Sequence, residues 1–356
     1  MDGENDLRTE HGGDWAGYQE EYGSLPMDFS ASISPLGLPK GVREAAVRAL
    51  DEADRYPDPL CRALCAKLAE KHGIPAGQIV CGNGAADLIH RLCSRLRPRH
   101  ALLAAPDFTE YRRALQSAGC GISLFPLQAE DGFRLGTAFA DTIGEETDIV
   151  FLSNPNNPSG VLTGREVLEP ILQRCREKNC LLVVDECFLD FAEREAEVSM
   201  IPALDGTPQL AVLKAFTKTY AMAGLRLGYL LCGNAELAAA LQREGQPWPV
   251  SHIAQEAGLA ALTEENYVNL LRRLITTERK RMAQALDEMG FTVIPGEANY
   301  LLLQSGNTRL CDRLRRRGIL IRDCSCYDGL GPGWYRVAVR TERENSALLG
   351  ALREVL

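Results

Sequence analysis

Between residues 79 and 231, short apolar runs alternate with longer stretches that carry apolar residues at helical spacing. Each run is about as long as a buried strand and ends in turn-forming residues. This alternation is typical of a mostly parallel sheet with helices on both faces, an α/β fold. The predicted strands cover residues 79–81, 101–105, 121–125, 149–153, 181–185, 210–213 and 227–231.

The pattern changes on both sides of this region. Residues 1–45 are rich in Gly, Pro and Ser and show little periodicity, so we expect an N-terminal arm that packs on another part of the protein. Residues 251–289 predict one long helix, followed by strands at 291–294, 300–303, 318–322 and 335–339 and by a closing helix from Arg343. We therefore expect an arm (1–45), a large domain (46–245) and a smaller α+β C-terminal domain (246–356).

Composition narrows the possible functions. The 356 residues are 46% hydrophobic and 24% charged, as in globular proteins, and the net charge of −9 argues against a nucleic-acid partner. No apolar run approaches the length that spans a bilayer, so we expect no membrane insertion. The twelve cysteines lack the spacing of a zinc site, and the first ten residues are charged. We expect no signal peptide, reduced thiols and a cytoplasmic location.

Polar residues gather where four predicted strands end, at 81–85, 154–160, 184–186 and 214–218. In open α/β sheets, ligands bind in the crevice at the carboxyl ends of strands. The Gly-rich turn at 82–85 precedes a predicted helix and could bind a phosphate, although an ordinary turn has the same composition. Asp185 ends an apolar run, where a buried carboxylate needs a cationic partner. A protonated pyridine nitrogen, a helix cap and an internal ion pair all remain open.

The segment from Thr217 to Tyr229 carries the strongest chemical signal. It places Lys218 among uncharged residues, eight positions before Arg226. An amine in such surroundings can have a lowered pKa, and a guanidinium suits a phosphate group. This pairing distinguishes Lys218 from an ordinary solvated surface lysine.

The order and spacing of GNGA (82–85), NPNNPSG (154–160), VVDE (183–186) and TKTYAMAGLRLGY (217–229) resemble the fold-type I pyridoxal 5'-phosphate (PLP) enzymes of the aspartate-aminotransferase superfamily. Within it, the chain resembles the histidinol-phosphate aminotransferase branch, and most of all the threonine-phosphate decarboxylases of the cobalamin pathway. This second resemblance runs nearly end to end. It includes HGG (11–13), DFS (28–30), PLG (35–37), RYP (55–57), APDF (105–108), EY (110–111), ANYLLL (298–303), LIRD (320–323) and YRVA (335–338).

The resemblance implies a role for each matching residue around PLP. Lys218 would be the Schiff-base lysine and proton shuttle, and Asp185 would pair with the pyridinium nitrogen. Asn157 would donate a hydrogen bond to the phenolate oxygen, and Phe108 would stack on the ring. The PLP phosphate would be held by Gly84, Ala85, Thr217 and Arg226, with Tyr56 of a second subunit. A site completed in this way implies a homodimer.

The same resemblance assigns substrate contacts. Arg336 would bind the α-carboxylate, while Arg322 and His11 would lie near the distal, phosphate-bearing end. A guanidinium suits either anion, so the sequence leaves open which arginine binds which group. Ser32, a further expected substrate contact, and Ser34 stand where the decarboxylase pattern has asparagines. These two departures bear on substrate identity.

Two further departures bear on the reaction. Aminotransferases of the superfamily usually have a tyrosine three residues after the aspartate, and this chain has Phe188, as the decarboxylases do. Ala215 lacks the hydroxyl that often contacts the cofactor phosphate. The resemblance to the decarboxylases implies a PLP-dependent carboxy-lyase that converts L-threonine O-3-phosphate, or a close analogue such as phosphoserine, to an aminoalkyl phosphate and CO2 in cobalamin side-chain biosynthesis. The alternative is a histidinol-phosphate-type aminotransferase, and a catalytically silent PLP-fold protein is disfavoured because the whole residue set is present.

Overall fold

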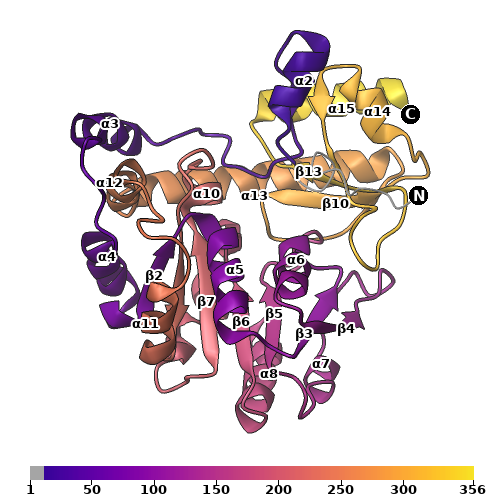
Figure 1. The fold of residues 1–356 in the computed structure, drawn as a ribbon. Coiled ribbons are helices and arrows are strands. Elements are labelled where there is room, and N and C mark those ends of the chain that lie inside the picture. The colour runs from indigo at the N-terminus through magenta and orange to yellow at the C-terminus, as the bar shows by residue number, and fades with distance from the viewer. Residues whose placement is uncertain (1–11) are drawn as a thin grey trace.

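The computed structural model describes residues 12–356 and is built around a seven-stranded sheet (Figure 1). Strand β8 is antiparallel to both of its neighbours, and all other pairs in this sheet are parallel. The prediction of a mostly parallel α/β sheet is therefore confirmed. In sheet order the strands are β2 (Ile79–Gly82), β8 (Gly228–Cys232), β7 (Leu210–Ala215), β6 (Leu181–Asp185), β5 (Ile149–Ser153), β3 (His100–Ala105) and β4 (Gly121–Pro126).

Helices cover both faces of the sheet because its strands are apolar on both sides. Along β5, Val150 belongs to one buried cluster and Phe151 to the other, as expected when successive side chains point to opposite faces. Helices α5 (Gly84–Leu96), α6 (Thr109–Ser117) and α11 (Ala235–Arg243) contribute to the cluster that holds Phe151. Helices α4 (Arg62–His72), α8 (Arg165–Glu177) and α12 (His252–Ala261) contribute to the cluster that holds Val150.

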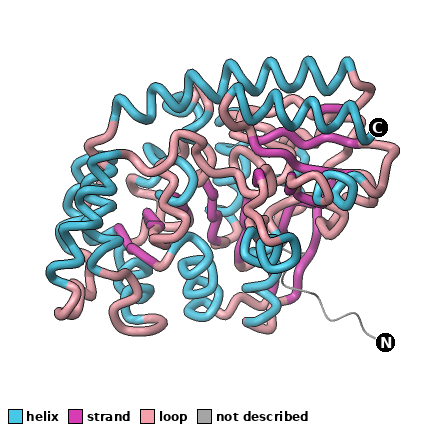
Figure 2. The backbone as a smooth tube through the Cα atoms, turned by 90° about the horizontal axis from the view of Figure 1, so that it is seen from above, coloured by secondary structure: helices cyan, strands magenta, loops and turns pink. Residues whose placement is uncertain are grey.

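The C-terminal part is an antiparallel sheet with helices on one side. Its strand order is β12 (Arg322–Asp323), β13 (Trp334–Ala338), β10 (Tyr300–Gln304) and β9 (Thr292–Val293). Helix α13 (Glu265–Glu288) and the closing helix α15 (Glu342–Val355) lie side by side (Figure 2), and α14 (Leu310–Arg315) packs on α15. A capping box between Thr341 and Glu344 fixes the start of α15, one residue before the predicted start.

Two predicted elements are wrong in detail. The helix expected over 251–289 is two helices, α12 and α13, and the Thr263 hydroxyl donates to the Ala260 carbonyl where α12 ends. The strand expected over 318–322 is divided, because its two parts have different partners. Strand β11 (Ile319–Leu320) pairs with β1 (Met27–Asp28), whereas β12 pairs with β13.

The predicted arm has more regular structure than its sequence suggested. It contains α2 (Trp15–Tyr22), β1 and most of α3 (Lys40–Ala49), and it packs on two separate segments of the C-terminal part of the chain, through the β1–β11 pair and the contact between α3 and α12. The division into domains at residue 246 stays a prediction, since α12 packs on α3 and α4. Within residues 12–356, no helix has the length and apolar character needed to cross a membrane. The remaining short helices are α7 (Ala138–Asp141), α9 (Glu195–Val198) and α10 (Phe216–Thr219).

Candidate active site

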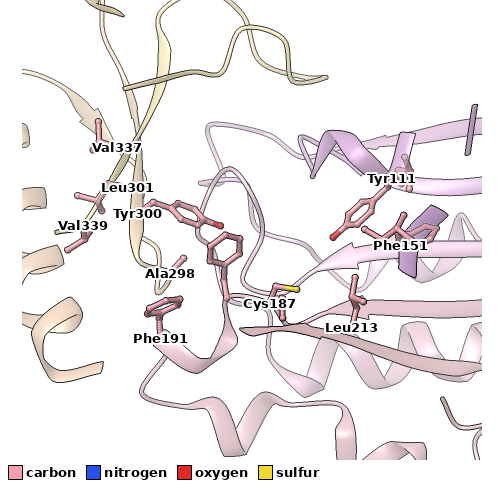
Figure 3. Close-up of a cluster of buried hydrophobic side chains, with 14 of the residues drawn as sticks. Tyr111, Phe151, Cys187, Phe191, Leu213, Ala298, Tyr300, Leu301, Val337 and Val339 are labelled. Atoms are coloured by element: carbon pink, nitrogen blue, oxygen red, sulfur yellow. The ribbon is translucent and has the colours of Figure 1, made fainter. Parts of the chain in front are cut away.

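A cavity of about 190 Å³ lies where the parallel strands of the large sheet end and the C-terminal sheet begins. Figure 3 shows part of the buried hydrophobic cluster next to this cavity, with Tyr111 and Cys187, which also line the cavity, and Tyr300 on β10. The cavity brings together ten of the residues predicted from the sequence: Ser32, Ala85, Phe108, Asn157, Asp185, Thr217, Lys218, Arg226, Arg322 and Arg336. The turns after four separate strands therefore meet at one edge of the sheet, as expected for a ligand site.

The turn between β2 and α5 is shaped to hold an anion. Gly84 has φ of +82°, a conformation that favours glycine, and a Cβ there would lie 2.6 Å from Nη2 of Arg226, so any larger residue would displace that guanidinium. Asn83, which precedes α5, forms no side-chain cap hydrogen bond, and so it leaves the first N–H groups of this helix for another acceptor. A phosphate between these N–H groups and the Arg226 guanidinium fits this geometry.

Two lysines lie four residues apart on the β7–α10 segment, and their surroundings give them different chemistry. Burial lowers the pKa of Lys218 to about 8, and the nearby charges of Arg336 and Arg226 act in the same direction. Lys214 is more completely buried than the half-buried Lys218, but its Nζ lies 2.9 Å from Oδ1 of Asp190, and carboxylates raise its pKa well above the usual value in spite of burial. Lys218 is thus the amine that can lose its proton, and it lines the cavity.

Asp185, at the end of β6, is buried with both carboxylate oxygens in hydrogen bonds. Oδ2 accepts from the Tyr111 hydroxyl at 2.7 Å, and Oδ1 accepts from the backbone N–H of Cys187 at 2.9 Å. Burial raises the pKa of Asp185, while these hydrogen bonds lower it. A cationic ring nitrogen in the cavity would favour the ionised form. Tyr111 was not predicted as a site residue, and its only sequence signal was its place in the EY motif.

Phe108, Phe188 and Asn157 also line the cavity. The Phe108 ring meets Tyr111 edge to face, with ring centroids 5.5 Å apart. The Phe188 ring lies 5.7 Å from Nζ of Lys218 and offers no hydrogen-bond donor where aminotransferases usually have a tyrosine. Asn157 Oδ1 accepts from Nη1 of Arg336, which leaves the amide N–H groups of Asn157 as donors to a ligand.

Two arginines face the same cavity from neighbouring strands. Arg322 on β12 and Arg336 on β13 are direct partners across the antiparallel pair, and both are buried. Like charges opposite each other are unfavourable unless an anion lies between or beside them. Nη2 of Arg336 donates to the Ser30 carbonyl at 3.2 Å, while its Nε is buried without a partner. The pair is therefore suited to a ligand with negatively charged groups.

The two serines that depart from the decarboxylase pattern have different surroundings. Ser32 lines the cavity, and its hydroxyl is buried without a hydrogen-bond partner. The Ser34 hydroxyl lies 2.6 Å from the hydroxyl of Tyr267, which itself donates to the Gly37 carbonyl. Ser32 can therefore contact a ligand, whereas Ser34 holds the chain against α13.

Three residues from the prediction need separate description. Tyr56 does not line the cavity of its own chain, is 78% exposed and stacks on Trp248 with ring centroids 4.2 Å apart. His11 lies outside the described residues. Ala215 lines the cavity with a methyl group where a hydroxyl was noted as missing.

Comparisons with known proteins agree with this geometry. Residues 26–352 match the family model for aminotransferase class I and II. The chain is 41% identical to threonine-phosphate decarboxylase from Salmonella typhimurium, over 93% of this chain and 91% of that protein. It is 34% identical to a histidinol-phosphate aminotransferase from Nitratidesulfovibrio vulgaris, over 92% and 88% of the two chains. The structure of histidinol-phosphate aminotransferase from Sinorhizobium meliloti in complex with pyridoxal-5'-phosphate superposes with a TM-score of 0.87 at 25% identity, over 96% and 94% of the chains.

Proposed function

Because the chain belongs to the aminotransferase class I and II family, we propose that it is a PLP-dependent decarboxylase of L-threonine O-3-phosphate. The products are an aminoalkyl phosphate and CO2. The high identity to the Salmonella decarboxylase over nearly the full length of both chains supports decarboxylation over amino transfer. Phe188 supports it as well, since the phenol donor usual in aminotransferases is missing at that position.

The residues of the cavity fit PLP. The glycine turn and Arg226 would hold the phosphate, Asp185 would face the ring nitrogen, and Lys218 would bond to the aldehyde carbon. Phe108 and Asn157 would contact the ring from the two neighbouring turns. Bound in this way, the cofactor supplies an electron sink for the bond broken at the substrate Cα.

The protein's own side chains would carry the remaining steps. Asp185 would favour the protonated form of the ring nitrogen by pairing with it, and the hydrogen bond from the Tyr111 hydroxyl holds this carboxylate in place. Arg336 orients the α-carboxylate, which leaves as CO2 when the bond from Cα to the carboxyl carbon breaks. Lys218 Nζ, which lines the cavity, would deliver a proton to Cα.

The observation that carries the substrate assignment is the opposed pair Arg322 and Arg336 in one cavity with Lys218. Two guanidiniums next to a reactive amine suit an amino acid with two anionic groups, one carboxylate and one phosphate. Arg322 is expected to bind the phosphate, with the Ser32 hydroxyl as a further donor, because Arg336 already contacts Asn157, one of the expected ring-binding residues.

A homodimer is proposed as the working form. Tyr56 and Trp248 stack on each other as exposed aromatic rings, and Val47, Leu50 and Leu60 expose further apolar surface along the same part of the chain. An exposed apolar face of this kind is typical of an interaction site. Tyr56 would reach the PLP phosphate of the partner subunit from this face. A cytoplasmic location stays a prediction.

Product analysis tests the function directly. The purified protein is incubated with PLP and O-phosphothreonine, and both CO2 and keto-acid products are followed. CO2 with the aminoalkyl phosphate is expected. Efficient amino transfer from histidinol phosphate to 2-oxoglutarate, without CO2 release from phosphothreonine or phosphoserine, would replace the proposal with the aminotransferase.

A further inference from the structure

Asp107 is a buried carboxylate just after β3, behind the wall of the cavity. Among the residues that the structure describes, it has no ion-pair partner. Its Oδ1 accepts from the backbone N–H of Phe108 at 2.8 Å and from the Ser153 hydroxyl, and its Oδ2 accepts from the Ser153 N–H at 3.3 Å. Burial raises the pKa of Asp107 to about 7, although these hydrogen bonds oppose the rise. Burying the Asp107 carboxylate therefore costs free energy of folding, and a functional role would explain why an aspartate stands at this position.

Asp107 connects to two of the expected cofactor contacts. It bonds directly to the N–H of Phe108, whose ring faces the cavity. It also bonds to the Ser153 hydroxyl, and the oxygen of that hydroxyl accepts from the backbone N–H of Asn157 at 2.9 Å. One carboxylate thus fixes the turn that carries Phe108 and the turn that carries Asn157.

The opposite ends of the same two strands provide a comparison. Asp148, just before β5, accepts at Oδ2 from the N–H groups of Arg99 at 2.6 Å and His100 at 3.2 Å, next to the start of β3. It also joins β3 to β5, but its side chain is 33% exposed, and it lies far from the cavity residues in the fold. A carboxylate can therefore join β3 to β5 without being buried. Of the two aspartates, Asp107 is the one whose hydrogen-bond partners line the cavity.

We propose that Asp107 is a positioning residue that orients Phe108 and Asn157 towards PLP, acting through the Phe108 N–H and the Ser153 hydroxyl. The proposal rests on the proposed function, because it takes these two residues as cofactor contacts. Asp107 does not line the cavity and acts only through its neighbours. Ordered acceptors behind a binding site reduce the freedom that its contact residues would lose on binding.

The test compares Asp107→Ala, Asp107→Asn and Ser153→Ala with the control Asp148→Ala. Three quantities are measured: the Kd of the apoprotein for PLP, the absorption maximum of bound PLP, and the Tm of the apoprotein. Asp107→Ala should weaken PLP binding at least about tenfold, or about 1.4 kcal/mol, and shift the absorption maximum, because Asn157 is expected to face the ring oxygen. Ser153→Ala should shift the maximum in the same direction. Asp107→Asn keeps the Oδ1 acceptor and should stay within about threefold of the wild type.

Further comparisons separate positioning from stability. Asp148→Ala should lower Tm while Kd and absorption stay unchanged. The double variant Asp107→Ala/Ser153→Ala should bind PLP no more weakly than Asp107→Ala alone, because both changes interrupt one hydrogen-bond chain. The proposal is overturned if Asp107→Ala lowers Tm as the control does but leaves Kd and absorption unchanged, or if the two losses add. If Asp107→Ala does not fold, Ser153→Ala decides: a lowered Tm with unchanged Kd and absorption overturns the proposal. A wild-type protein that binds no PLP would instead overturn the proposed function.

Discussion

At the scale of single residues, two lysines four positions apart favour opposite protonation states. Lys218 faces a cavity that contains arginines, so its neutral form is favoured. Lys214 faces Asp190, with Glu195 at 3.7 Å and Glu186 at 4.0 Å from its Nζ, so its charged form is favoured. In the sequence these are simply two lysines on one segment. Their different protonation follows from where β7 and α10 direct each side chain in the fold.

Lys218→Ala is expected to reduce turnover at least about a thousandfold, since no other cavity residue can both bond to the cofactor and relay a proton. Mass spectrometry of the wild type after borohydride reduction should place the pyridoxyl adduct on Lys218. The matched control is Lys214→Met, which should keep the adduct but destabilise the fold by about 3–5 kcal/mol, because the buried Glu186 and the partly buried Asp190 would lose their cationic partner. An adduct on Lys214 would contradict the assignment.

The lowered pKa of Lys218 predicts a pH dependence in the apoprotein. Only the neutral amine attacks the PLP aldehyde, so the rate of covalent binding should rise with pH and level off above about 8. An ordinary lysine would level off only near about 10.4. Stopped-flow absorbance after mixing apoprotein with PLP measures this rate. A plateau near 10 would show that burial and the two arginines do not act on Lys218 as the structure indicates.

At the scale of elements, the paired strands β12 and β13 place Arg322 and Arg336 side by side. Arg336→Lys keeps the charge but loses the planar fork that binds a carboxylate through two hydrogen bonds. The KM for phosphothreonine should rise roughly 10- to 100-fold, because hydrogen bonds to charged groups contribute about 1.5–3 kcal/mol. Binding of the corresponding aminoalkyl phosphate, which has no carboxylate, should change little. An equal loss for both compounds would remove Arg336 from carboxylate binding.

Some helices, strands and site contacts could be predicted from the sequence, and others could not. The strands at 149–153 and 181–185 were predicted residue for residue, because a fully buried strand between helices leaves a short apolar run with clear turn residues at its ends. The break between α12 and α13 was missed because helical spacing of apolar residues continues through the turn. The motifs placed Lys218, Asp185 and Asn157 at one edge of the sheet. The hydrogen bonds of Tyr111 and Asp107 could not be predicted, since they depend on tertiary contacts between separate turns.

At the scale of the whole molecule, the cavity draws on nearly the full length of the chain. Ser32 comes from the arm, Lys218 from the large sheet and Arg336 from the C-terminal sheet. Strand β1 of the arm pairs with β11, which directly precedes the strand of Arg322. The substrate-binding side of the cavity is thus held by segments from both ends of the chain, which accounts for a resemblance that extends nearly end to end.

Mixing two inactive or impaired variants tests whether the site is shared between subunits. If Tyr56 completes the partner's site, Tyr56→Ala should weaken PLP binding, and Lys218→Ala should be inactive. In a mixed dimer, the subunit with Tyr56→Ala keeps its own Lys218 and receives Tyr56 from the subunit with Lys218→Ala, so one of its two sites is complete. After denaturation and joint refolding in equal amounts, about half of the dimers are mixed, and about a quarter of all sites should have wild-type activity. Sedimentation should show a dimer throughout. Activity no higher than the mean of the two separately refolded variants would show that Tyr56 serves its own subunit or none, and a monomer at micromolar concentration would rule out the shared site.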